Sequence, residues 1–81
     1  MVFSAILKEV REFIADGNDI SKLDNDTNLF DSGFFDSLRV INLVLFIETT
    51  YELTLDYEDL TETNLSTVTV ISKLIERKLA D

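Results

Sequence analysis

The stretch LFDSGFFDSLRVINLV, residues 29–44, decides how the chain folds. Gly33 can adopt a left-handed turn conformation at no side-chain cost, and Asp36 is a favourable N-cap for a helix that begins with Ser37. Ser37 is therefore expected at a helix N-terminus. Unpaired backbone N–H groups and the positive end of the helix dipole lie there, so an anionic group such as a phosphate is favoured on or beside the Ser37 hydroxyl.

The helix that starts at Ser37 is expected to continue to about Glu52, and it carries two apolar stripes. One stripe faces the core and consists of Val40, Leu43, Val44, Ile47 and Tyr51. The second stripe lies on a different side and consists of Leu38, Ile41 and Leu45. It is either additional core, covered by the fourth helix or the loop, or an exposed patch for docking partners. The pattern does not assign Phe46 to either stripe.

The residues before this stretch predict one amphipathic helix and a long loop. Residues 2–15 place apolar side chains at helical spacing, namely Phe3, Ile6, Leu7, Val10, Phe13 and Ile14. Residues 16–19 end this helix, with Gly17 suited to the left-handed cap position. The loop should contact the core through Ile20, Leu23, Leu29 and Phe30. Core packing is also the expected role of at least one of Phe34 and Phe35.

The residues after the second helix predict two more helices. Leu53 and Leu55 should close the bundle from a short extended link, and residues 56–60 should form a short helix begun by Asp56. Ser66 is expected to cap the final helix, whose inward stripe is Val68, Ile71, Leu74, Ile75 and Leu79. The predicted fold class is all-α: a small four-helix bundle with a long loop between helices 1 and 2 and a short third helix. Residues 1–81 should form a single domain.

The composition excludes several classes of function. Sixteen acidic and seven basic residues give a formal net charge of −9. This charge opposes binding to nucleic acid and to anionic membranes, and a helix-turn-helix DNA-binding protein would need a basic face that the sequence lacks. Without a secretory signal or a run of roughly 18 apolar residues, the chain is expected to be cytoplasmic, and a monomer is the default expectation.

The chain contains no cysteine and no histidine. A disulfide, a thiolate–zinc site and a Ser–His or Cys–His catalytic pair are therefore excluded within it, and a hydrolase using Ser37 would have no base to activate the hydroxyl. If the protein works through a thiol, a cofactor must supply it.

Residues 24–28 alternate carboxylates with amides, as in a calcium-binding EF-hand loop. Leu29 occupies the sixth position, where glycine is needed for the turn, and Phe35 the twelfth, where a bidentate glutamate is needed. No metal site is therefore predicted, because Asx turns in a solvated loop explain these residues more simply.

Asp36-Ser37-Leu38, at the start of the second helix, resembles the motif of the acyl carrier and peptidyl carrier protein family. The order of helices and loop extends the resemblance over almost the whole chain. It implies a bundle of acyl-carrier type in which a phosphopantetheinyl transferase, assisted by magnesium, joins 4′-phosphopantetheine from coenzyme A to the Ser37 hydroxyl. Asp36 and Leu38 would be recognition elements. The thiol of the arm would carry cargo as a thioester, so the chain is expected to be a non-catalytic carrier.

The same resemblance implies a surface that docks partner enzymes. In the family, positions matching Leu38, Ile41 and Leu45 face the partners, and the position matching Leu55 lies near the cargo. Polar residues of the second helix and carboxylates of the third should complete this surface. The expected partner-binding residues are Leu38, Arg39, Ile41, Asn42, Leu45, Glu48, Leu55, Glu58 and Asp59.

The second helix differs from that of the acidic carriers of fatty-acid synthesis, which have several carboxylates where this chain has Arg39, Asn42 and Thr49-Thr50. The pattern Leu-Phe-x-Ser-Gly-x-x-Asp-Ser-Leu is more similar to discrete carriers of specialised metabolism, such as polyketide and nonribosomal peptide biosynthesis, and to D-alanyl carriers. The expected partners include an acyl- or aminoacyl-loading ligase and downstream biosynthetic enzymes.

Two alternatives stay open. The chain could be a carrier of fatty-acid synthesis, or a small helical protein-interaction domain that has no covalent cofactor and docks through the second stripe. Within the carrier class, an apolar cargo could lie between the second and third helices, although the bulk of Phe46, Ile47 and Tyr51 argues against a long buried chain.

Overall fold

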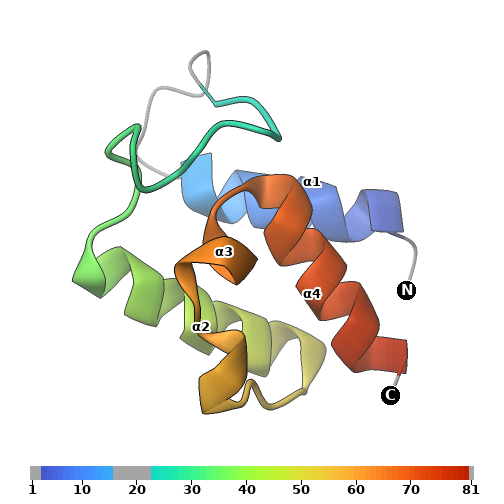
Figure 1. The fold of residues 1–81 in the computed structure, drawn as a ribbon. Coiled ribbons are helices and arrows are strands. Elements are labelled where there is room, and N and C mark those ends of the chain that lie inside the picture. The colour runs from blue at the N-terminus through green and yellow to red at the C-terminus, as the bar shows by residue number, and fades with distance from the viewer. Residues whose placement is uncertain (1–2, 16–22, 81) are drawn as a thin grey trace.

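The computed structural model describes residues 3–15 and 23–80 of the chain, and all regular secondary structure in these ranges is helical. The long helices are α1 (Phe3–Ala15), α2 (Ser37–Tyr51) and α4 (Val68–Ala80). Two short elements lie between α2 and α4, the 3-10 turn η2 (Tyr57–Asp59) and the helix α3 (Glu62–Leu65). The predicted all-α four-helix bundle, with a long loop between its first two helices, is confirmed (Figure 1).

The core lies between the long helices, and α1 packs most extensively against α4. From α1 it receives Ile6, Val10 and Ile14, and from α4 it receives Val68, Ile71, Leu74 and Ile75, each at most 4% exposed. Ser72 is buried among these apolar side chains, and its hydroxyl donates a hydrogen bond to the Val68 carbonyl at 2.8 Å. This bond satisfies the buried hydroxyl within its own helix.

The second helix completes the core with Leu43, Ile47 and Tyr51. Phe13 stacks on Phe46, and the Tyr51 hydroxyl donates a hydrogen bond to Glu9 Oε1 at 3.0 Å, so α2 runs antiparallel to α1. Burial raises the pKa of the Tyr51 phenol, and the hydrogen bond to Glu9 adds to this effect. The sequence pattern did not assign Phe46 to either stripe of α2. In the structure Phe46 is half-buried against α1.

Hydrogen bonds of the kind expected for Asx turns shape the loop before α2. Asp24 Oδ1 accepts from the Asp26 backbone N–H, and Asn28 Oδ1 accepts from the N–H groups of Phe30 and Asp31. Leu29 is fully buried, and its backbone N–H donates to the Ser66 carbonyl at 2.7 Å. The loop is therefore fixed to the start of the C-terminal region. The predicted contact of Leu23 is confirmed, whereas the predictions for Gly17 and Ile20 lie outside the described residues.

In the C-terminal region one prediction holds in part and two are wrong. Residues 56–60 contain a short helix that begins after Asp56, but it is the 3-10 turn η2, and a separate helix, α3, follows at Glu62–Leu65. The cap of α4 is Thr67, whose Oγ1 accepts from the Val70 N–H at 3.0 Å, while the Ser66 hydroxyl donates to the Thr63 carbonyl at the end of α3. Leu79 is 39% exposed, because it lies in the last turn of α4, beyond the core.

Lys78, near the C-terminus of α4, forms ion pairs with Asp56 and Asp59 at 3.1 and 2.7 Å. The Lys78 hydrogen bond, together with the Asp56 backbone N–H, lowers the pKa of the Asp59 carboxyl below its ordinary value of 3.8. The contacts with both carboxylates raise the pKa of Lys78 above 10.5. These contacts hold η2 against α4.

The lowered pKa of Asp59 predicts a loss of stability in acid. Its contribution is fully present above pH 3.8 and is lost as the pH falls through the folded-state pKa. We expect Asp59→Asn to lower the free energy of unfolding slightly at neutral pH. The variant should also show a smaller decline of this free energy below about pH 4, because an unperturbed aspartate has a pKa near 3.9. Urea titrations at several pH values measure this. Glu58→Gln, at the exposed neighbouring carboxylate, should change little; an equal effect of both variants would contradict the prediction.

None of the helices in the described ranges is long and apolar enough to cross a membrane.

Candidate functional site

Ser37 is the first residue of α2, and its side chain is exposed. Asp36 is the N-cap: it has extended backbone angles (φ −127°, ψ −178°), and its Oδ1 accepts from the Arg39 N–H at 2.9 Å. The Asp36 carbonyl accepts the first helical hydrogen bond, from the Val40 N–H. The N–H groups of Ser37 and Leu38 have no acceptor within the helix, because they belong to its first turn. The predicted N-cap and helix start are confirmed.

The loop fixes the direction in which α2 begins. Gly33 has φ +86°, in the left-handed region that its lack of a side chain permits. Beyond it, the Phe35 N–H donates to the Leu29 carbonyl at 3.0 Å. The rings of Phe30 and Phe35 pack in a T-shaped arrangement, with centroids 5.3 Å apart. Phe34 and Phe35 are both half-buried against the core. Asp36 and Ser37 are thus the first exposed residues after an anchored pair of aromatic rings.

The Asp36 cap predicts a measurable stability effect. Asp36→Ala removes the acceptor of the Arg39 N–H and should lower the free energy of unfolding by about 1 kcal/mol, within a range of roughly 0.5–2. Asp36→Asn keeps an oxygen acceptor and should recover most of this loss. Urea denaturation followed by circular dichroism measures both variants, and equal losses would show that the hydrogen bond is not the cause.

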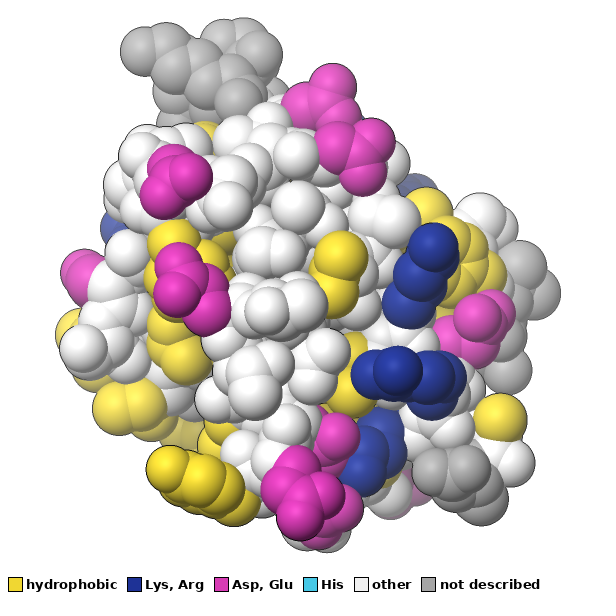
Figure 2. All heavy atoms as spheres, viewed as in Figure 1, with side chains coloured by type: hydrophobic (Ala, Val, Ile, Leu, Met, Phe, Trp, Pro, Cys, Tyr) yellow, Lys and Arg dark blue, Asp and Glu magenta, His cyan; other side chains and the backbone are white. Residues whose placement is uncertain are grey.

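The second apolar stripe of α2 is exposed. Leu38, Ile41 and Leu45 are 66%, 56% and 56% exposed, so neither the loop nor α4 covers them. Of the two interpretations of this stripe, additional core is therefore wrong. Arg39 and Asn42 are exposed on the same helix. In Figure 2 the visible basic side chains lie mostly over α4.

The other predicted partner-binding residues differ in accessibility. Glu58 is exposed on η2. Leu55 is only 7% exposed and closes the core, and the Glu48 carboxylate accepts from the Leu55 N–H at 3.0 Å. Asp59 is 17% exposed at its side chain, because Lys78 covers it. Glu48, Leu55 and Asp59 therefore have structural contacts in the free chain.

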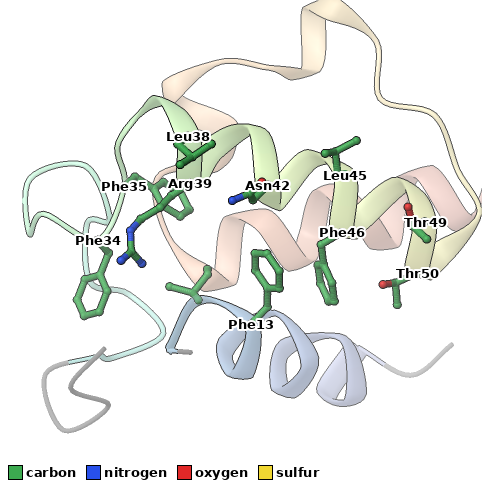
Figure 3. Close-up of a pocket in the computed structure, with 11 residues that line it drawn as sticks. Phe13, Phe34, Phe35, Leu38, Arg39, Asn42, Leu45, Phe46, Thr49 and Thr50 are labelled. Atoms are coloured by element: carbon green, nitrogen blue, oxygen red, sulfur yellow. The ribbon is translucent and has the colours of Figure 1, made fainter. Parts of the chain in front are cut away.

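A groove of about 670 Å³ runs along the side of α2 that faces α1 (Figure 3). Phe13 and Phe46 form part of its wall, with ring centroids 4.4 Å apart and an angle of 18° between the rings. The end next to Ser37 is lined by Phe34, Phe35, Leu38 and Arg39, and the far end by Thr49 and Thr50. The lining is mostly apolar, and its volume is in the range of small-molecule sites.

Four predicted partner-binding residues line this groove, namely Leu38, Arg39, Asn42 and Leu45. Sequence reasoning missed the groove itself, because it considered a cargo only on the opposite side of α2, towards the third helix. A signal was present: Arg39, Asn42, Phe46 and Thr49 follow one another at spacings of three, four and three residues, so they share one face of α2. What the spacing does not show is that Phe13 of α1 lies opposite that face.

The surroundings of Ser37 suit a covalently attached phosphate. The hydroxyl is exposed, the helix N-terminus favours negative charge, and the Asp36 carboxylate is engaged by the Arg39 N–H. Within residues 3–15 and 23–80, no three carboxylates are grouped closely enough to hold a metal ion. The site therefore offers an accessible nucleophilic oxygen and a favourable electrostatic environment.

Comparison with known protein families matches residues 4–75 to the family described as phosphopantetheine attachment site. The match spans the region from the second residue of α1 into α4 and includes Ser37 and the groove. No curated protein matches the chain. Carrier domains of this family are generally non-catalytic, are modified by phosphopantetheinyl transferases and interact with partner enzymes. The four-helix fold and the extent of this match together show that the chain belongs to the phosphopantetheine attachment site family and is a carrier protein whose cofactor is 4′-phosphopantetheine.

Proposed function

We propose that Ser37 is the residue to which 4′-phosphopantetheine is attached, and that the chain carries acyl or aminoacyl groups in specialised biosynthesis. The observation that supports this assignment is the exposed Ser37 side chain at the first position of α2, directly after the Asp36 cap. The terminal thiol of the attached arm supplies the chemistry, since it holds the cargo as a thioester.

The attachment reaction requires one oxygen atom from this chain. The Ser37 Oγ forms a bond to the β-phosphorus of coenzyme A, and the bond from that phosphorus to the nucleotide part breaks. The serine proton goes to a base of the transferase, because this chain has no histidine and its Asp36 carboxylate is engaged at the cap. The helix N-terminus favours the phosphodiester after it has formed.

Partner enzymes would dock on the exposed apolar residues of α2 and the polar residues beside them. Leu38, Ile41 and Leu45 offer apolar area at the site of attachment, and Arg39 and Asn42 add polar contacts. Glu58 extends this surface onto η2. Docking by a small surface of this kind is weak, which allows a carrier to leave one enzyme for the next.

The charge of α2 supports a role outside fatty-acid synthesis. Its sequence contains only two charged residues, Arg39 and Glu48, and the Glu48 carboxylate accepts a hydrogen bond from the Leu55 backbone. Arg39 is therefore the exposed charge that a partner meets on this helix. A complementary partner would combine an apolar surface with a carboxylate opposite Arg39, whereas an acidic helix would select a basic partner surface.

The test is the intact mass of the protein after incubation with coenzyme A, magnesium and a broad-specificity phosphopantetheinyl transferase. A single phosphopantetheine addition, mapped by fragmentation to the peptide that contains Ser37, is the expected result. An addition at another residue, or none with several transferases, would overturn the assignment of Ser37. Subsequent loading trials with acyl, aminoacyl and D-alanyl ligases would identify the class of cargo.

A further inference from the structure

We infer that the arm attached at Ser37 lies in the groove between α1 and α2, and that this groove accepts an aromatic or short apolar acyl cargo. The inference rests on attachment at Ser37, the proposed function, and adds to it the path of the arm and the chemical class of the cargo. The groove begins beside Ser37, since Leu38 and Arg39 line its near end.

The start of α2 allows the arm to reach this side. Side chains of an α-helix tilt towards its N-terminus, so a group on the first residue leaves from the end of the helix and not from one flank. From that end the arm passes Leu38, which is 66% exposed and lines the groove. Figure 3 shows Leu38 and Arg39 at the same end of the groove as Phe34 and Phe35.

The lengths of arm and groove agree. Leu38 and Phe46 are eight residues apart on α2, or about 12 Å along the helix axis. From phosphorus to sulfur the arm has about as many bonds as four residues of backbone, so it spans roughly 15 Å when extended. An arm that starts at Ser37 and follows the groove therefore brings its sulfur to the level of the stacked rings of Phe13 and Phe46.

The side chains along this path match the arm and the cargo. Arg39 is the ionisable residue of the lining and lies at the phosphodiester end. Asn42 lies midway, is exposed and makes no side-chain hydrogen bond to the described part of the chain, so its amide can pair with the amides of the arm. Phe13 and Phe46 offer apolar and aromatic surface where the thioester arrives. An aromatic acyl group gains contact there, whereas a charged amino group would lose hydration.

The experiment compares two exposed helix residues, one that lines the groove and one that lies outside both the groove and the docking surface. Asn42→Trp places a bulky ring in the groove, and Lys73→Trp places the same ring on the exposed side of α4. Wild-type protein and both variants are loaded with a benzoyl-pantetheine arm through a stable amide in place of the thioester, and mass confirms the loading. Nuclear Overhauser effects between the benzoyl protons and the rings of Phe13 and Phe46 are then measured.

We expect these effects in the wild type and in Lys73→Trp and their complete loss in Asn42→Trp. An alanyl arm with a free amino group should not show them even in the wild type. The inferred path of the arm would be overturned if the benzoyl group contacted Ile41 or Leu55, or made no contacts on a fully loaded protein. The inferred cargo class would be overturned if the benzoyl and alanyl arms made equal contacts. Failure of the wild type to accept any arm would overturn the proposed attachment and this inference together, and mass shows that outcome before any spectrum is recorded.

Discussion

Replacing Ser37 with Ala is expected to abolish the addition of phosphopantetheine and all subsequent loading with cargo. The attachment needs the Ser37 oxygen, and alanine has none. The fold should be retained, because the Ser37 side chain is exposed and the helix cap is supplied by Asp36. Intact-protein mass measures the modification, and far-ultraviolet circular dichroism measures the helix content of the same sample.

Ser32→Ala is the matched control. Ser32 is an exposed serine of the loop just before α2, and its replacement should leave the modification intact. A Ser37→Ala protein that still gains the mass of one arm would contradict the assignment. Loss of modification in both variants would also contradict it, because the transferase would then depend on the loop and not on the Ser37 hydroxyl.

Leu43→Ala should have the largest effect on stability, lowering the free energy of unfolding by about 2–5 kcal/mol. Leu43 is fully buried between α2 and the rest of the bundle, so its truncation removes apolar contacts and leaves a cavity. Because a small domain has a total stability of roughly 5–15 kcal/mol, this variant should be partly unfolded under mild conditions.

Leu45→Ala, the same substitution two residues further along α2, should change the free energy of unfolding by no more than about 0.5 kcal/mol. Its side chain is 56% exposed, and alanine is a favourable helix residue. Urea denaturation midpoints compare the two. If Leu45→Ala were as destabilising as Leu43→Ala, the exposed stripe would belong to the core, and the docking proposal would lose its basis. A docking role instead predicts that Leu45→Ala weakens partner binding in a fully folded protein.

The features that the sequence predicted correctly depend on local chemistry. Gly33 adopts positive φ, Asp36 caps α2, and the amides and carboxylates before Leu29 form turns, each through contacts within a few residues. The helical spacing of apolar residues likewise identified most of the buried positions of α1 and α2, although Val40 and Val44 are only half-buried and buried Ala15 was not among those predicted. A pattern of this kind is determined by the residue itself and its immediate neighbours, so it can be read without the tertiary structure.

The features that it missed depend on distant parts of the chain. Ser66 and Thr67 are adjacent hydroxyl residues with similar capping tendencies, and Ser66 instead ends α3 while its carbonyl accepts from Leu29. Asp59 is a plausible docking carboxylate in the sequence, but Lys78 reaches it from α4. The groove exists only because Phe13 of α1 lies against Phe46 of α2. None of these pairings has a local signal.

The two tyrosines give the protein two built-in fluorescent reporters. The chain has no tryptophan, so its emission comes mainly from Tyr51 and Tyr57. Tyr51 is 6% exposed and bonded to Glu9, whereas Tyr57 is 92% exposed on η2, next to Glu58. Emission from Tyr51 should change when α1 and α2 separate, and emission from Tyr57 should change when a partner covers η2. Replacing either tyrosine with phenylalanine would leave one reporter, so unfolding and docking could be followed separately without an added label.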